Sequence, residues 1–290
     1  MSTAPGRPKQ ARTAARQVEG AQVSAALPSG DAPTSAPFDR FRLDDRLVLV
    51  TGASGGLGRH FAALLARAGA RVALAARRID QLAGSVAAIE AAGGRARALS
   101  LDVTDAASVR RCLDDLGDWG PPDVVINNAG VTVTRTLLAQ TEADYDLVLG
   151  TNLKGCWLVA TEAARRMVAA GRGGSIVNIA SILGQRVAGG VAPYAISKAG
   201  VVQATKAMAL ELARHRIRVN ALLPGYVETD LNRDFLRGEA GEKMRQRIPS
   251  QRFGEPADLD GPLLLLASDA GAAMSGAVVV VDGAHLVSSL

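Results

Sequence analysis

From about residue 43 to the C-terminus, short apolar runs alternate with longer stretches in which apolar positions recur at helical spacing. The apolar runs are nearly unbroken, which is typical of strands that are buried on both faces of a parallel sheet. The pattern predicts strands at residues 47–51, 71–75, 95–100, 124–127, 175–179, 219–223 and 277–281. It predicts helices between them, including 56–68, 79–92, 153–170 and 193–213. We therefore expect an α/β fold, a doubly wound parallel sheet of about seven strands with helices on both faces.

The N-terminal segment has a different composition. Residues 1–40 are rich in Ala, Pro, Ser and Gly and show no apolar periodicity, so they cannot bury enough surface to offset the entropy of ordering. We expect a disordered tail at 1–40 and a single domain at 41–290. No apolar run reaches the roughly 18 residues needed to cross a bilayer, so no membrane association is expected.

Charge and composition exclude several function classes. The net charge of +5 is modest for 290 residues, aromatics make up only 3%, and no basic stripe recurs in the folded part, so nucleic acid is not an expected partner. The two cysteines, Cys112 and Cys156, indicate neither a disulfide framework nor a zinc site, and a cytoplasmic location fits them best. His60, His215 and His285 lack metal-ligand spacing, so no metal is expected.

A glycine-rich loop, TGASGGLG, stands between the first expected strand and the first expected helix. Gly52 would permit a tight turn, Gly56 would let the backbone approach a pyrophosphate, and Gly58 would let the helix pack on the sheet. The helix N-terminus would offer free N–H groups to the anion. Ser54 would add a donor for phosphate, and Leu57 lies within the same loop. Placed in a βαβ unit, this loop predicts a Rossmann-like dinucleotide site.

The residue after the second strand bears on the choice of dinucleotide. A carboxylate there would accept hydrogen bonds from the adenosine ribose and repel a 2′-phosphate, but the chain has Arg77 followed by Arg78. A guanidinium suits a phosphate, so NADP(H) is favoured over NAD(H). NAD(H) remains possible, because the arginines also fit a solvated helix start and because Gly55 occupies a loop position where a second basic residue would strengthen the preference.

Two further strand ends offer contacts to the dinucleotide. Asp102 and Val103 follow the third strand, where they would hydrogen-bond an adenine edge, although Asp102 also fits a helix cap. Asn128, Ala129 and Gly130 follow the fourth strand, where small residues would let the backbone lie close to the sugar. A purely structural turn is the alternative for Asn128.

The candidate chemistry lies between residues 181 and 198. Tyr194 and Lys198 are four apart in a helical run, so their side chains would be neighbours on one helix face. A nearby ammonium lowers the pKa of a phenol, which would make Tyr194 a tunable general acid or base. Ser181 follows a buried strand and would present its hydroxyl to a substrate oxygen. A solvated helix face is the alternative interpretation of the Tyr–Lys pair.

The ordered motifs TGASGGLG, NNAG, TNLKG, Ser181 followed by YAISK, PGYVET and VDG resemble those of the short-chain dehydrogenase/reductase family from about residue 43 to the end. The resemblance implies that Tyr194 exchanges a proton with the substrate oxygen and Ser181 polarises the carbonyl. It implies that Lys198 lowers the pKa of the tyrosine and holds the nicotinamide ribose, and that Asn152 holds a relay water. It also implies that four residues wrap the nicotinamide carboxamide: Pro224, Gly225, Val227 and Thr229. The chain departs from the family in having VDGAH where a double glycine is more frequent.

The family resemblance implies reversible reduction of a ketone or aldehyde to an alcohol, with either a 3-oxoacyl thioester or a small ketone, sugar or cyclic alcohol as substrate. Residues 182–191 and a charged segment at 231–249, expected to be a mobile helical lid, would select it. The bases of the lid would attract an acidic substrate or form a mixed-charge solvated face. The Ala-rich helices 153–170 and 193–213 predict a homotetramer. A nucleotide-sensing protein without turnover is the alternative, against which the intact motif residues count.

Overall fold

The structure, a computed structural model, describes residues 1–2, 38–229 and 232–288. By its contacts the chain divides into two units, Met1–Ala36 and Pro37–Leu290, and the elements below belong to the second. The tail expected at 1–40 falls mostly outside the described residues. A short 3₁₀ turn, η1 (Asp39–Phe41), is already formed, and Arg40 donates a hydrogen bond to the carbonyl of Asp269 at 2.8 Å. Regular structure therefore begins at Asp39, two residues before the expected start of the domain at residue 41.

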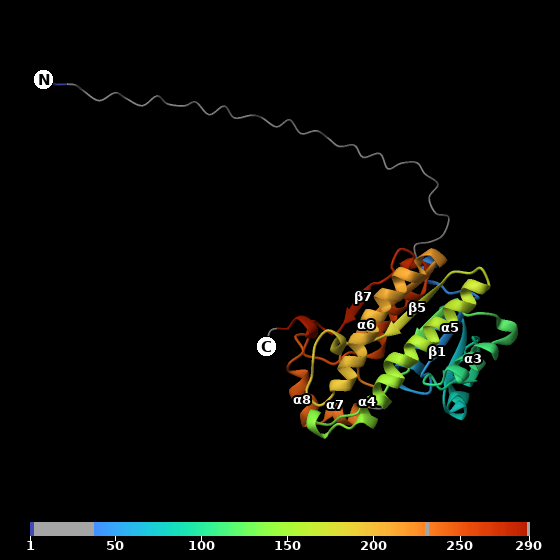
Figure 1. The fold of residues 1–290 in the computed structure, drawn as a ribbon, viewed down its shortest axis with the longest axis horizontal. Helices are drawn as coiled ribbons and strands as arrows, with labels where there is room; N and C mark the ends of the chain where they lie inside the picture. Colours follow the sequence, from blue (N-terminus) through green and yellow to red (C-terminus); the bar gives the residue numbers. More distant parts are fainter. Residues whose placement is uncertain (3–37, 230–231, 289–290) are drawn as a thin grey trace. The chain divides into compact units, whose positions relative to one another are not determined.

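Seven strands form one parallel sheet in the order β3–β2–β1–β4–β5–β6–β7 (Figure 1). The strands are β1 (Leu47–Thr51), β2 (Arg71–Ala76), β3 (Arg95–Ser100), β4 (Val124–Asn127), β5 (Gly174–Ile179), β6 (Ile217–Pro224) and β7 (Val278–Val281). The predicted sheet is confirmed, with most strand ends within two residues of the expected positions. The half-polar sequence of β3 is tolerated because this strand lies at an edge of the sheet.

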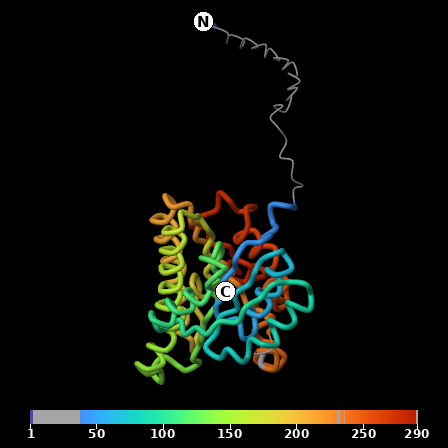
Figure 2. Tube along the Cα trace, turned by 90° about the vertical axis from the view of Figure 1, so that its right-hand side faces the viewer, coloured from blue at the N-terminus to red at the C-terminus, as the bar shows by residue number. Residues whose placement is uncertain are grey.

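Helices cover both faces of the sheet. The helices are α1 (Gly56–Arg67), α2 (Ala83–Ala91), α3 (Ala106–Asp114), α4 (Glu142–Leu149), α5 (Cys156–Ala169), α6 (Ala192–Leu212), α7 (Arg233–Arg237), α8 (Glu239–Arg245) and α9 (Asp260–Ala267). Helices α3, α5 and α6 share one apolar core with the sheet, while α1, α2 and α9 share another on the opposite face (Figures 1 and 2). None of the helices in the described ranges combines the length and apolar character needed to cross a bilayer.

Two predicted helices are divided. The segment expected as one helix at 79–92 begins with a 3₁₀ turn, η2 (Ile79–Leu82), because Leu82 is buried while Ile79 is 48% exposed and the first turn has no continuous apolar stripe. The segment expected at 153–170 begins instead with a π-helical turn, η5 (Gly150–Gly155), which leads directly from α4 into α5. Such wider turns are common at functional sites.

The order of the strands places a crevice at one edge of the sheet. From β1 the chain moves outward through β2 and β3, and it then returns to β4 on the other side of β1. In open parallel sheets the ligand site lies outside the carboxyl ends of the strands, at the point where this direction reverses. The loops that follow β1 and β4 therefore frame the expected site.

Candidate active site

The glycine-rich loop after β1 has the backbone conformations that its glycines permit. Gly52 has φ +64°, and a Cβ there would lie 2.8 Å from the Cα of Ala129. Gly58 lies against the carboxyl end of β1, because a Cβ there would lie 2.3 Å from the carbonyl oxygen of Gly52. A side chain at position 58 is thus excluded by the close approach of α1 to the residues that follow β1 and β4.

The N-terminus of α1 is open to an anion. Gly55 is the N-cap, and no side chain caps the first turn. A Cβ built on Gly55 would meet nothing within 4 Å, so free space adjoins these N–H groups. Uncapped N–H groups and the positive end of the helix dipole favour a phosphate at this place.

The loop after β4 is tied to the loop after β1. Thr51 accepts hydrogen bonds from the backbone N–H groups of Asn128 (3.0 Å) and Ala129 (3.1 Å). The side-chain amide of Asn128 donates to the carbonyls of Thr51 (3.0 Å) and Gly52 (3.3 Å). The Asn128 side chain therefore holds the two loops together, which agrees with the structural role given above as the alternative. Only its backbone is free to line the crevice.

The ends of β2 and β3 lie beside these loops. Arg77 and Arg78 are exposed and form no ion pair or side-chain hydrogen bond with the described residues. Asp102 accepts hydrogen bonds from the backbone N–H (2.9 Å) and hydroxyl (2.7 Å) of Thr104. The helix that follows is capped by Asp105, so the capping alternative for Asp102 is wrong. Val103 is buried.

Lys198 is buried at the carboxyl end of β5. Its ammonium donates to the carbonyl of Ile179 at 2.7 Å, and burial lowers the pKa of Lys198 to about 8. A Cβ on Gly130 would lie 3.6 Å from this Nζ and 3.3 Å from Oδ1 of Asn152. The glycine thus lets the backbone after β4 lie against both polar groups.

Tyr194 and Ser181 face each other beside this lysine. The Nζ of Lys198 lies 5.6 Å from the Tyr194 ring centroid. Burial raises the pKa of Tyr194, and a hydrogen bond from Ser181 opposes this effect. The expected lowering of the tyrosine pKa by Lys198 is not found, because the ammonium is directed to Ile179 and desolvation dominates. The Ser181 oxygen also accepts from the N–H of Leu183 at 3.1 Å.

Asn152 occupies the π-helical turn η5. Its Oδ1 accepts from the N–H of Val131 at 2.8 Å, and its Nδ2 donates to the carbonyl of Val131 (2.9 Å) and to the hydroxyl of Ser197 (3.0 Å). The Ser197 hydroxyl donates to the carbonyl of Tyr194 at 2.7 Å. These bonds connect the loop after β4 with the helix that carries Tyr194 and Lys198.

The comparisons with known proteins agree with this arrangement. The profile of a family described as enoyl-(acyl carrier protein) reductase matches residues 52–284. A solved short-chain type dehydrogenase/reductase from Mycobacterium marinum is 40% identical, with a TM-score of 0.82 over 86% of this chain and 98% of that one. The chain belongs to the short-chain dehydrogenase/reductase family. Both the predicted family and the predicted fold are confirmed.

Two curated members of the family cover most of the chain. L-rhamnose 1-dehydrogenase (NAD(P)(+)) from Azotobacter vinelandii is 39% identical over 85% of this chain and 98% of its own length. A 3-oxoacyl-[acyl-carrier-protein] reductase from Thermotoga maritima is 36% identical over 85% of this chain and its full length. The chain is an NAD(P)-dependent oxidoreductase, and the alternative of a binding protein without turnover has no support among these relatives.

The residues present fit the dinucleotide that the family uses. The uncapped N-terminus of α1, the free space beside Gly55 and the exposed Arg77 suit phosphate groups. The backbone cradle at Gly130 lies beside Lys198, where a ribose hydroxyl would find a donor. A Cβ at Gly130 would crowd Asn152 and Lys198 in this cradle, and a Cβ at Gly52 would clash with the backbone of Ala129 beside it.

The nicotinamide wall expected from the family lies at the end of β6. Pro224 ends the strand, and the N–H of Gly225 donates to the carbonyl of Val281 at 2.9 Å. Val227 is buried and bridges to Gly254. Thr229 is held by Asn232, whose Oδ1 accepts from its N–H at 2.7 Å and from its hydroxyl at 3.2 Å. These residues are thus ordered at the same edge of the sheet as Ser181.

A cluster near Tyr194 joins three residues that sequence reasoning missed. Tyr226 has a raised pKa from burial and from the charge of Tyr194, so the two phenols are within electrostatic reach. The rings of Tyr226 and His285 have centroids 5.7 Å apart, and Nδ1 of His285 is buried without a hydrogen-bond partner among the described residues. Arg186 donates to the carbonyl of His285. The signal for this cluster in the sequence is weak: Tyr226 and His285 are polar residues within the motifs PGYVET and VDGAH.

The segment expected as a lid contains two short helices, α7 and α8, and residues 230–231 lie outside the described residues. Its charges are mostly paired. Arg237 contacts Glu228 at 2.8 Å, Lys243 contacts Glu239 at 2.7 Å, and Arg245 contacts Glu242 at 2.6 Å. This pairing supports the mixed-charge surface over a cationic attractor.

Both cysteines and His60 take structural positions. Both cysteines are buried and free, and burial raises the pKa of Cys112 and Cys156 to about 12. Nε2 of His60 lies 2.6 Å from a carboxylate oxygen of Asp260. Within the described ranges, no group of His, Cys, Asp and Glu side chains could hold a metal ion.

Proposed function

We propose that the protein reversibly oxidises a secondary alcohol to a ketone at the Ser181–Tyr194–Lys198–Asn152 site. The observation that carries the proposal is the convergence of Tyr194 with the Ser181 hydroxyl and the buried Lys198 beside the dinucleotide crevice. When bound, the nicotinamide supplies or accepts the hydride.

Tyr194 acts as the general acid in the reductive direction. The raised pKa keeps its phenol protonated at neutral pH, so that it can give a proton to the substrate oxygen. The Ser181 hydroxyl has one hydrogen, which it offers to the tyrosine oxygen here and would turn to the carbonyl oxygen of a bound substrate, polarising it. Lys198 keeps a positive charge close to the phenolate that forms. Asn152 donates a hydrogen bond to Ser197, which donates to the carbonyl of Tyr194, and these bonds fix the helix that carries Tyr194 and Lys198.

The substrate we favour is a polyhydroxylated ketone or its alcohol, such as a sugar. Tyr226 lies within electrostatic reach of Tyr194, and it forms a cluster with His285 and Arg186 that offers donors and acceptors suited to hydroxyl groups. The activity named for the Azotobacter relative, on L-rhamnose, supports this choice. A 3-oxoacyl thioester is the second candidate, supported by the activity named for the Thermotoga relative.

A substrate panel distinguishes these candidates. We expect nicotinamide absorbance to change with sugars and polyols, L-rhamnose included, and to stay constant with 3-hydroxyacyl-coenzyme A. Turnover of the thioester alone would assign the second candidate instead. Absence of turnover with every alcohol and ketone, in the presence of NADP or NAD, would contradict the proposed function.

We expect NADP(H) to be the preferred cofactor because Arg77 is exposed at the end of β2 without an acidic partner among the described residues. Arg77→Ala should weaken NADP binding by about ten- to a hundredfold, since a charge-assisted contact is lost, and should leave NAD binding unchanged. Dissociation constants from nicotinamide fluorescence measure both. Arg110→Ala, which removes an equal charge from α3, is the control, and an unchanged NADP affinity in Arg77→Ala would contradict the assignment.

We also propose a homotetramer. Large apolar side chains are exposed on three neighbouring helices: Leu147 (49%) on α4, Trp157 (47%) on α5, and Ile196 (50%) and Leu210 (82%) on α6. Such a face is typical of a surface covered by a symmetry-related copy. Sedimentation at micromolar concentration should give four chains, and Trp157→Glu should give a smaller species. A monomeric wild type would contradict this expectation.

A cytoplasmic location completes the proposal. It is supported by the free, buried state of both cysteines, which fits a reducing compartment.

A further inference from the structure

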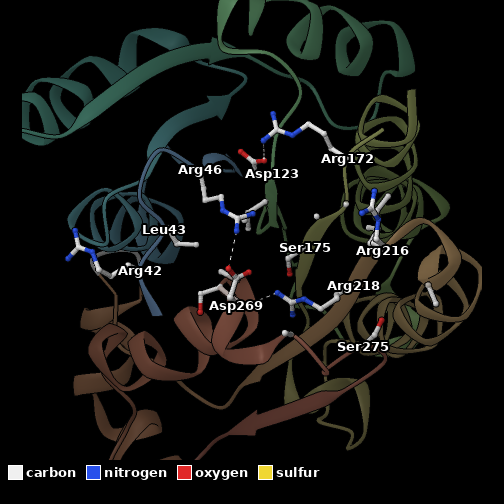
Figure 3. Close-up of a pocket in the computed structure, with 18 of the residues that line it drawn as sticks. Arg42, Leu43, Arg46, Asp123, Arg172, Ser175, Arg216, Arg218, Asp269 and Ser275 are labelled. Carbon is white, nitrogen blue, oxygen red and sulfur yellow. Dashed lines mark hydrogen bonds and ion pairs between the residues drawn. The ribbon is translucent and has the colours of Figure 1, made fainter. Parts of the chain in front are cut away.

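A cavity of about 780 Å³ opens at the amino ends of the strands (Figure 3). It is lined by the segment before β1, by the turns that lead into β5 and β6, and by the turn after α9. Its volume lies within the range of small-molecule sites. Nothing in the proposed reaction uses this cavity.

Guanidinium groups dominate its lining. Among the described lining residues are five arginines and only two acids, Asp123 and Asp269. The arginines are Arg42, Arg46, Arg172, Arg216 and Arg218. They come from separate segments of the chain; in Figure 3, Arg46 and Arg218 extend toward the middle of the opening, whereas Arg42 extends away from it. Positive charge is therefore concentrated at this recess by the fold rather than by sequence proximity.

Three of these arginines have carboxylate partners. The pairs are Arg42 with Asp44 (2.6 Å), Arg46 with Asp269 (3.0 Å) and Arg172 with Asp123. Arg216 and Arg218 form no ion pair with the described residues. Arg216 donates to the carbonyl of Gly171 at 3.1 Å, and Arg218 donates to that of Ser268 at 2.9 Å. Carbonyl groups orient these two guanidinium groups, and the Asp269 carboxylate acts on Arg218 without forming an ion pair with it.

The two unpaired arginines are suited to act together. Arg216 immediately precedes β6 with a left-handed backbone (φ +59°), and Arg218 is the second residue of the strand; both line the cavity. Desolvation lowers the pKa of the half-buried Arg218 against the opposing effect of the Asp269 carboxylate, and the charge of Arg46 lowers it further. An anion between the two groups would offset both effects.

We infer that this cavity binds a small molecule bearing phosphate groups, held by Arg216 and Arg218. A guanidinium matches phosphate through two parallel N–H···O bonds, and two such groups without carboxylate partners suit a pyrophosphate better than a single carboxylate. A recessed site of this volume accepts a small anion rather than a nucleic-acid backbone.

The site is separate from the dinucleotide crevice. Strand β5 begins at the cavity with Gly174 and leads at its other end towards Ser181, and a six-residue strand spans about 20 Å. A ligand at the cavity and a cofactor at the crevice can therefore be present together.

The test uses the full chain with saturating NADPH, so that the glycine-rich loop is already filled. Pyrophosphate and ADP are each titrated calorimetrically. We expect one added site per chain, with ADP tighter than pyrophosphate if the ligand is a nucleotide and equal to it if the phosphates alone are recognised. Arg216→Gln should weaken binding at least tenfold, and Arg218→Gln should do the same.

Arg110→Gln, which removes an exposed charge from α3, should leave binding unchanged. Because Arg218 also supports the backbone near Ser268, the unfolding temperature of each variant is measured, and Arg216→Gln alone suffices if Arg218→Gln is unstable. The inference is overturned if neither anion binds at millimolar concentration, or if Arg110→Gln weakens binding as much as Arg216→Gln does.

Discussion

Tyr194→Phe should lower kcat by about 10²–10⁴-fold while leaving the affinity for NADPH within a few-fold of the wild type. The substitution removes only the hydroxyl, which is the proton donor that we assign to the substrate oxygen. The ring and its place on α6 beside Lys198 are retained, so the crevice keeps its shape. Steady-state turnover of the best alcohol in the substrate panel, together with nicotinamide fluorescence, separates the two quantities.

Tyr145→Phe is the matched control, because Tyr145 is 43% exposed on α4 and lies outside the proposed machinery. It should keep full turnover. A Tyr194→Phe enzyme with kcat within threefold of the wild type would show that the proton comes from another group.

Lys198→Met should remove the pH dependence of cofactor binding above pH 8 and also reduce turnover severely. In the wild type the ammonium loses its proton near pH 8, so NADPH affinity should fall through this value by up to tenfold per pH unit. Methionine fills a similar volume without a charge, and its affinity for NADPH should be weak and constant across the same range. Fluorescence titrations from pH 6 to about pH 10 measure the difference.

The burial of Lys198 also predicts that the folded protein becomes more stable as the pH rises, whereas its affinity for NADPH falls. The folded-state pKa of about 8 lies below the ordinary value of 10.5, so burying the protonated lysine costs up to about 3 kcal/mol. This cost is present in full below pH 8 and disappears as the pH rises to 10.5, where the unfolded chain also loses the proton. Lys198→Met should therefore melt several degrees higher than the wild type at pH 7, with a smaller gain at pH 10.

Lys206→Met, an exposed lysine on the same helix, is the control and should change neither property. If Lys198→Met melts no higher than the wild type at pH 7, burying the charged lysine carries no penalty. If the NADPH affinity of the wild type does not change up to pH 10, Lys198 does not titrate near pH 8.

Much of the fold was predictable because each strand is an apolar run and each connection contains a helix. The run 47–51 is buried along its whole length, and Gly52 has the positive φ that its turn requires. The residues of the candidate site were predictable from family motifs, which place Ser181, Tyr194 and Lys198 at one sheet edge. Their grouping follows from the parallel order of the strands.

The remainder depends on distances that no local pattern contains. The pKa of Tyr194 depends on burial as well as on Lys198, and the carbonyl of Ile179 that orients the ammonium has no signature in its side chain. Thr51 and Ser197 are essential connectors, yet each is one of many hydroxyl residues in the sequence. The cluster around Tyr226 joins segments that are distant along the chain.

The wide turn at Gly150–Gly155 makes the chain sensitive to length at one point. Between α4 and α5 the backbone carries one residue more than an ordinary helix of the same rise would hold. Losing a single residue there would shorten the turn to regular geometry and rotate everything before it by about 100° relative to α5. Asn152 would then turn away from Val131 and Ser197. A deletion that removes none of the named site residues would therefore still break the hydrogen bonds that connect the loop after β4 with α6.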